Sequence, residues 1–241
     1  MGCGGSSVKE GRPNEPKQFH DMSEEEKEQV KKLIEEQDKD LKEETKEEAE
    51  DFYEKYDWDE LKKKLPVQKT KKEREERLAL WNQINEYGNG YISFKRLNVQ
   101  LEKYLDLPNV VKNKGPIKLA FDSACNKYAK KGMKADDNLL EWMEFRIFLV
   151  YLRQYFEYWA MFERVDKSGD HQINLEEFKK AVPQMESWGV KISDPDSTFK
   201  EIDQNNEGAI SFEQFCKYAI QKSLDLEEDD GFDDEELKNL K

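Results

Sequence analysis

Histidine and cysteine are scarce in this chain of 241 residues, which holds two histidines and three cysteines. With only His20 and His171, a histidine-based catalytic triad or a zinc site is difficult to assemble. Cys3, Cys125 and Cys216 are widely separated, which argues against a disulfide framework and fits a reducing compartment. A Gly-rich phosphate loop is also missing from the sequence. The composition therefore predicts a protein that is not an enzyme and has no small-molecule substrate.

Long apolar runs are also lacking. The most apolar stretch, Ile147–Leu152, is far too short to cross a bilayer, and the first residues do not form a secretory signal. Charged residues make up 39% of the chain and hydrophobic residues 36%, which fits a small helical core with long solvated segments. The net charge of −14 argues against nucleic acid as a partner, because phosphates would repel such a chain.

The most informative segment that is present runs from Asp166 to Glu177 and reads DKSGDHQINLEE. A twelve-residue calcium loop between two helices takes oxygen ligands from positions 1, 3, 5, 7, 9 and 12. Those positions hold Asp166, Ser168, Asp170, the backbone carbonyl of Gln172, Asn174 (through water) and Glu177. The spacing predicts a Ca²⁺ site of the EF-hand type, and the alternative is an acidic surface turn that binds no metal.

Two positions inside this loop affect its shape and its packing and are not metal ligands. Position 6 is His171, where the sharp turn normally requires Gly, and His tolerates a left-handed backbone better than most residues. Position 8 is Ile173, which we expect to point into the core and to pair with a neighbouring loop. A working site with a less favourable turn is the expectation.

A second loop, Asp203–Gln214 (DQNNEGAISFEQ), follows with Gly208 at position 6 and Ile210 at position 8. Its last ligand is the weak point, because the neutral amide of Gln214 cannot replace a bidentate carboxylate. Two interpretations stay open: a weak Ca²⁺ site or a purely structural partner of the first loop. The ligands of a weak site would be Asp203, Asn205, Glu207, the carbonyl of Ala209, Ser211 and Gln214.

Two further copies of the unit have lost their ligands. Asn85–Arg96 (NEYGNGYISFKR) keeps Gly90 and Ile92 but has Arg96 at position 12, where a guanidinium would repel a metal. A fourth copy is visible from Leu140, Glu144 and Phe145 at positions 8, 12 and 13, while Met133 and Ala135 occupy ligand positions 1 and 3. The sequence thus predicts an all-α protein with four EF-hand units in two paired lobes, preceded by a charged helical extension.

The N-terminus, MGCGGSS, contains a signal for acylation. Gly2 and Ser6 fit the pattern for N-myristoylation, and Cys3 beside them is where a palmitoyl group would be added. A single myristoyl chain binds membranes only marginally, so stable anchoring needs the second acyl group. The alternative is a flexible Gly/Ser tail with an incidental match.

The remaining organisation follows from charge and periodicity. Ser23 and Glu26 form a capping box that opens a charged helix with a narrow apolar stripe, which either docks on the protein or serves as a partner-binding arm. The aromatic-rich segment Glu144–Val165 is expected to fill the cores of the lobes, or in part to line a groove. We expect a leader at 1–22, the extension at 23–52, EF-hand pairs at 53–152 and 153–225, and an acidic tail at 226–241.

The chain resembles the calflagins, the flagellar calcium-binding proteins of trypanosomes. The resemblance is carried by MGC at the start and by Trp58–Thr70, Glu141–Asp166 and Phe178–Pro195, whose AVP…WG…DP linker is unusual for calcium-loop proteins. It implies a dually acylated calcium sensor on the cytoplasmic face of the flagellar or ciliary membrane. It also implies myristate on Gly2 and palmitate on Cys3. The resemblance further implies that, as within the family, the third and fourth hands bind metal and the first two do not.

The function expected from these observations is a calcium-linked switch. Completion of the coordination sphere by Glu177 would reorient the flanking helices and expose apolar surface to a protein partner in the flagellum or cilium. A structural component of the axoneme or membrane skeleton, with little calcium regulation, is the rival interpretation.

Overall fold

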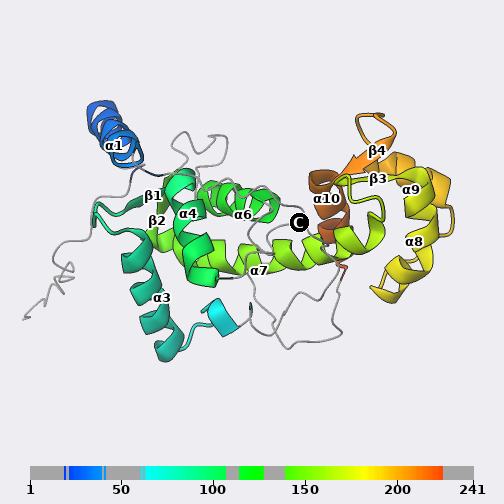
Figure 1. The fold of residues 1–241 in the computed structure, drawn as a ribbon, viewed down its shortest axis with the longest axis horizontal. Helices are drawn as coiled ribbons and strands as arrows, with labels where there is room; N and C mark the ends of the chain where they lie inside the picture. Colours follow the sequence, from blue (N-terminus) through cyan, green and yellow to red (C-terminus); the bar gives the residue numbers. More distant parts are fainter. Residues whose placement is uncertain are drawn as a thin grey trace, which may run out of the picture.

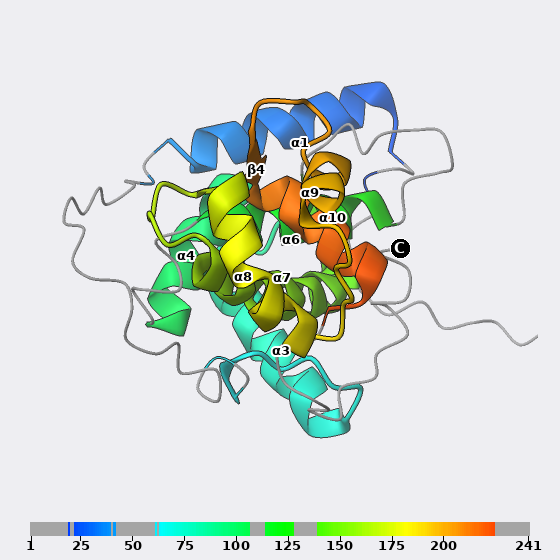
Figure 2. The same cartoon turned by 90° about the vertical axis from the view of Figure 1, so that its right-hand side faces the viewer.

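The computed structural model describes residues 19, 22–39, 41, 61, 63–106, 114–127 and 139–224. In this part of the chain, two groups of helices lie at the ends of one long helix, α7 (Trp142–Val165), which runs horizontally in Figure 1. Figure 2 looks along the molecule from the C-terminal group, with α1 (Glu24–Gln37) across the top. The helix α7 therefore belongs to both groups.

The N-terminal group is a pair of helix–loop–helix units. The first unit consists of α3 (Lys71–Ile84), the short strand β1 (Tyr91–Ser93) and α4 (Phe94–Leu105). The second consists of α6 (Lys114–Lys127), β2 (Leu139–Glu141) and α7. The strands are antiparallel, with Ile92 opposite Leu140, as expected for two residues at position 8. Met133 and Ala135, the expected degenerate ligand positions, lie outside the described residues.

The C-terminal group repeats this plan. Its first unit joins α7 to α8 (Leu175–Ser187) through β3 (Gln172–Asn174), and its second joins α9 (Pro195–Ile202) to α10 (Phe212–Lys222) through β4 (Ala209–Ser211). Ile173 lies opposite Ile210 in the antiparallel strand pair. The predicted fold class, all-α with two pairs of EF-hand units, is confirmed.

Local sequence explains where these helices begin. The side chains of Thr70, Ser93, Asn174 and Ser211 each accept a hydrogen bond from a backbone N–H in the first turn of the helix that follows. Such caps satisfy N–H groups that have no partner inside the helix. In all four units the N-cap of the exiting helix is loop position 9, which is also the last residue of the strand: Ser93, Glu141, Asn174 and Ser211.

One hydrophobic core runs through both groups, from Leu61 to Leu224. Six aromatic residues of α7 are among its largest buried side chains: Phe145, Phe148, Tyr151, Phe156, Trp159 and Phe162. These side chains pack in the core, which is the first of the two roles expected for this segment. The division of the lobes at 152/153 stays a prediction, and these two residues lie inside α7.

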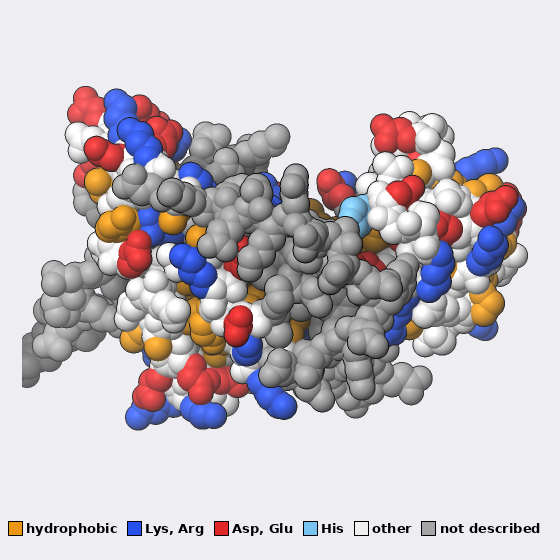
Figure 3. Space-filling view, in the orientation of Figure 1, with side chains coloured by type: hydrophobic (Ala, Val, Ile, Leu, Met, Phe, Trp, Pro, Cys, Tyr) orange, Lys and Arg blue, Asp and Glu red, His pale blue; other side chains and the backbone are white. Residues whose placement is uncertain are grey.

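The charged helix α1 begins with the predicted capping box of Ser23 and Glu26. Its apolar stripe docks on the protein, because Ile34 is buried in a small cluster with Phe19, Tyr91 and Leu139. Acidic and basic side chains are interspersed over its outer face, as they are over α3 (Figure 3). Gly2, Cys3 and the tail 226–241 lie outside the described residues. None of the helices described combines the length and apolar character needed to cross a membrane.

Candidate calcium site

The loop Asp166–Glu177 joins two helices whose ends are buried. Asp166 ends α7, where its backbone N–H donates to the carbonyl of Phe162 at 2.8 Å, and its side chain is nearly inaccessible at 3% exposure. Glu177 lies in the first turn of α8 and is 8% exposed. Two carboxylates, one from each helix, are therefore held at the two ends of the loop.

The Asp166 carboxylate organises the turn. Its Oδ1 accepts hydrogen bonds from the Ser168 hydroxyl at 3.0 Å and the Gly169 N–H at 2.8 Å, and its Oδ2 accepts from the His171 N–H at 2.9 Å. These bonds wrap the backbone around one carboxylate. They therefore determine the shape of the turn.

His171 adopts the left-handed backbone that position 6 requires, with φ of 62°. Its ring lies 5.6 Å from the ring of Trp159, measured between centroids. Trp159 in turn contacts Phe212 of α10 edge-on at 4.8 Å. The turn of this loop is thus in contact with the core that joins α7 to α10.

Glu177 is bonded to the backbone of its own loop. Its Oε1 accepts from the N–H groups of Lys167 at 3.1 Å and Ser168 at 2.9 Å, and its Oε2 accepts from the N–H of Asn174 at 3.1 Å. Within the ranges described, no three Asp, Glu, His or Cys side chains form a ready-made metal cluster. Both oxygens of the Glu177 carboxylate are thus directed toward the loop, the side on which position 12 would coordinate a cation.

The donor set of the loop suits Ca²⁺. It offers carboxylate, hydroxyl, amide and carbonyl oxygens, the hard ligands that Ca²⁺ prefers, and no sulfur or imidazole at a ligand position. The two carboxylates at its ends are withdrawn from water, which disfavours an uncompensated negative charge. Asp166 and Glu177 would hold the cation at the helix ends, with Ser168, Asp170, Gln172 and Asn174 completing its sphere.

The loop Asp203–Gln214 has the same frame but a different last residue. Asp203 is 5% exposed and accepts the N–H groups of Glu207 at 3.1 Å and Gly208 at 2.9 Å. The Gln214 amide donates to Asn205 Oδ1 at 3.1 Å and accepts from the Ser211 N–H at 2.8 Å. The side chain at position 12 is therefore hydrogen-bonded to Asn205, a predicted ligand at position 3.

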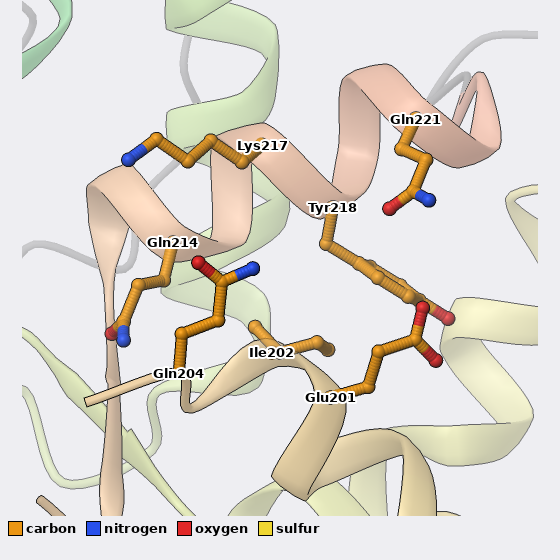
Figure 4. Close-up of a pocket in the computed structure, with 7 residues that line it drawn as sticks. All are labelled: Glu201, Ile202, Gln204, Gln214, Lys217, Tyr218 and Gln221. Carbon is orange, nitrogen blue, oxygen red and sulfur yellow. The ribbon is translucent and has the colours of Figure 1, made fainter. Parts of the chain in front are cut away.

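Gln214 also borders a small hollow between α9 and α10, in which Figure 4 shows it near Gln204 and Lys217. The hollow has a volume of about 160 Å³. Pockets for drug-sized ligands usually measure about 300–1,000 Å³, so this hollow is smaller than such a site.

The loop Asn85–Arg96 contains its own cation. The Arg96 guanidinium is buried and forms ion pairs with Asp38 of the α1 cap at 3.1 Å and with Glu86 at 2.8 Å. Asp38 was not expected to lie near this loop. No local signal could have revealed it, because the partners are 58 residues apart and Asp38 resembles the many other acidic residues of its segment.

Comparison with known proteins agrees with this geometry. The family model for the FCaBP EF-hand domain matches residues 61–152, and that for the EF-hand domain pair matches residues 158–220. The flagellar calcium-binding protein of Trypanosoma cruzi is 31% identical over 173 residues, which cover 71% of this chain and 82% of that protein.

Two relatives from Trypanosoma brucei brucei are similarly close. Flagellar calcium-binding protein TB-24 is 31% identical over 70% of this chain and 78% of its own length. Flagellar calcium-binding protein TB-1.7G is 32% identical over 70% of this chain and 74% of its own length. A solved homologue of programmed cell death 6 protein from Leishmania major is 15% identical, with a TM-score of 0.33, over 60% of this chain and 70% of that one. That last likeness is too low to support any conclusion.

The two EF-hand pairs, the oxygen-rich loop between α7 and α8, and the identity over most of the trypanosome proteins agree with one another. Ca²⁺ is the cofactor that these domains take. The chain belongs to the family of flagellar calcium-binding proteins, as a divergent member.

Proposed function

We propose that this protein is a calcium sensor of the flagellum or cilium, anchored to the cytoplasmic face of the membrane by acyl groups on Gly2 and Cys3. The observation that carries the proposal is the loop Asp166–Glu177, whose two end carboxylates are buried at facing helix ends. The flagellar names of the relatives support the location. The acylation pattern at the N-terminus supports the membrane anchor.

The switch would begin at Glu177. Bound Ca²⁺ supplies the positive charge that both Glu177 oxygens can share, in place of the N–H groups of Lys167 and Ser168. Because Glu177 belongs to the first turn of α8, its movement changes the direction of α8 relative to α7. Metal binding at Asp166–Glu177 is thereby converted into a rearrangement of helices.

The rearrangement has a route into the rest of the molecule. Helix α10 contacts both α7 and α6, and Phe162 of α7 packs edge-on against Phe212 and Phe215 at 5.5 and 5.6 Å. The hydroxyls of Ser123 on α6 and Tyr155 on α7 lie 3.1 Å apart. A change in the C-terminal pair would therefore be felt in the N-terminal pair, and apolar surface exposed there would be available to a protein partner.

The anchor is tested by Gly2→Ala. Without an N-terminal glycine no myristoyl group is added, and we expect the protein to move from the membrane fraction to the cytosol. Cys3→Ser should leave weak, reversible binding, because one myristoyl chain gives an association constant of only about 10⁴ M⁻¹. The measurement is detergent partitioning and flotation with vesicles, and Gly5→Ala, which leaves the acylation pattern intact, is the matched control.

A structural component of the axoneme or membrane skeleton is the second candidate. It is favoured by the first loop, where Arg96 takes the place of a metal ligand, and by the loop that ends at Gln214, whose neutral amide replaces the bidentate carboxylate. A skeletal component would remain in the detergent-insoluble fraction, and Gly2→Ala would not release it. That result would reject the acylated sensor in favour of the scaffold.

A further inference from the structure

We infer that Arg96 has replaced the metal of the first loop, and that its ion pair with Asp38 fixes helix α1 on the N-terminal pair at every calcium concentration. In this interpretation α1 is a built-in fifth helix of that pair, and the calcium response does not release it. The inference concerns the N-terminal pair and does not depend on where the protein is anchored.

The guanidinium of Arg96 meets an oxygen on each of its nitrogens. Nε donates to Asp38 Oδ1 at 3.1 Å, Nη1 to Glu86 Oε1 at 2.8 Å and Nη2 to the carbonyl of Gln37 at 3.0 Å. The ring of Tyr87 covers the guanidinium at 4.5 Å from its centroid. Arg96 stands at position 12 of the loop and Glu86 at position 2, so this covalently attached cation is bonded to one oxygen of the loop and to two oxygens at the end of α1.

Asp38 joins the end of α1 to the exit of the loop. Its carboxylate also accepts a hydrogen bond from the hydroxyl of Ser93, the residue that caps α4. Its backbone carbonyl accepts from Lys95 Nζ at 2.8 Å. Arg96 is only 3% exposed, and a buried charge pair of this kind requires both partners, because removing one leaves the other without compensation.

The opposite end of the segment is held as well. The backbone N–H of Phe19 donates to Glu141 Oε1 of β2 at 2.7 Å, and the Phe19 ring meets Tyr91 of β1 edge-on at 5.9 Å. Ile34 completes the apolar contact. Burial, reinforced by the charge of Glu141, raises the pKa of Tyr91 to about 12, as expected for a phenol covered by packed chain. Phe19 and Asp38 are thus attached at opposite ends of β1.

This attachment holds α1 on the N-terminal pair, while the loop Asp166–Glu177 lies at the other end of α7 (Figure 1). Because the cation at the first loop is a side chain, its occupancy cannot follow the calcium concentration. The docking of α1 therefore does not depend on calcium at this loop.

The test is amide hydrogen exchange of residues 24–37 in the full chain, with calcium and with a chelator. In the wild type we expect the same protection in both conditions. Asp38→Asn should accelerate exchange in α1 at least about tenfold, since local opening free energies follow the contacts that hold a segment. Glu25→Gln, an exposed acidic position on the same helix, is the matched control and should leave exchange unchanged.

Exchange in α8 and α10 reports whether the variants are folded. The double variant Asp38→Lys with Arg96→Glu reverses the pair and should recover part of the protection that either single variant loses. Protection of α1 that stays the same in Asp38→Asn, or that changes with calcium in the wild type as much as α8 does, would overturn the inference. Failure of the reversed pair to recover any protection would also contradict a charge-based attachment.

Discussion

Replacing Glu177 with Gln is expected to abolish the calcium-induced change in tryptophan fluorescence. The neutral amide offers one coordinating oxygen in place of two and removes a negative charge from the sphere. Affinity should fall at least about 100-fold, since residues that only support metal ligands already contribute factors of 10–100. Trp159 makes the effect visible, because its indole is buried and contacts His171 at the turn of the loop.

The neighbouring glutamate provides the control for this experiment. Glu176 lies in the same helical turn and is exposed, and its side chain bonds neither to the loop backbone nor to Asp166 in the described structure. Glu176→Gln should therefore keep the full fluorescence response at nearly the same calcium concentration. A response in Glu177→Gln that matches the wild type would show that Asp166–Glu177 is not the metal site.

Replacing Phe162 with Ala should lower the free energy of unfolding more than any other change proposed for this protein. Phe162 is fully buried near the end of α7, where it stacks on Trp159 at 5.5 Å and meets Phe212 and Phe215 of α10 edge-on. Truncating a phenylalanine in such a position removes buried apolar area and leaves a cavity, which costs about 3–5 kcal/mol. Urea unfolding in the absence of calcium measures this loss directly.

A matched truncation on the surface separates packing from general effects of mutation. Leu78 on α3 is 47% exposed, so Leu78→Ala should change the free energy of unfolding by no more than about 0.5 kcal/mol. The calcium response should weaken in Phe162→Ala as well, because α7 and α10 meet at this residue. A loss below about 1 kcal/mol would contradict the packing of Phe162 between α7 and α10.

The features that were predictable from sequence are those with a local cause. Positions 8 of paired loops must face each other, and Ile92 does lie opposite Leu140 and Ile173 opposite Ile210. The capping box of Ser23 involves residues three apart and is confirmed. The ligand positions of Asp166–Glu177 depend only on spacing, and they remain a prediction until a cation is measured there.

The features that were missed depend on contacts between distant segments. Nothing near Asp38 distinguishes it from other acidic residues, and only the folded chain brings it to Arg96. An arginine in place of a metal ligand did indicate an empty loop, but not that the loop had acquired a partner helix. The hydrogen bond from Gln214 to Asn205 is a similar case. The sequence showed that Gln214 is a poor metal ligand, but only the folded loop shows that its amide donates to Asn205.

With calcium bound at Asp166–Glu177 alone, as proposed, the form of the calcium response can be predicted. Strand pairing couples this loop to Asp203–Gln214, where the Gln214 amide is bonded to Asn205. The response should therefore rise with calcium without cooperativity. It depends on Glu177 and on the left-handed turn at His171.

The most direct test is a calorimetric calcium titration of the wild type beside Glu177→Gln and Asp203→Ala. We expect one calcium ion per chain, a titration that is lost in Glu177→Gln, and a stoichiometry that is unchanged in Asp203→Ala. Two equivalent sites in the wild type, or binding that survives Glu177→Gln and disappears in Asp203→Ala, would contradict the assignment of calcium to the loop between α7 and α8.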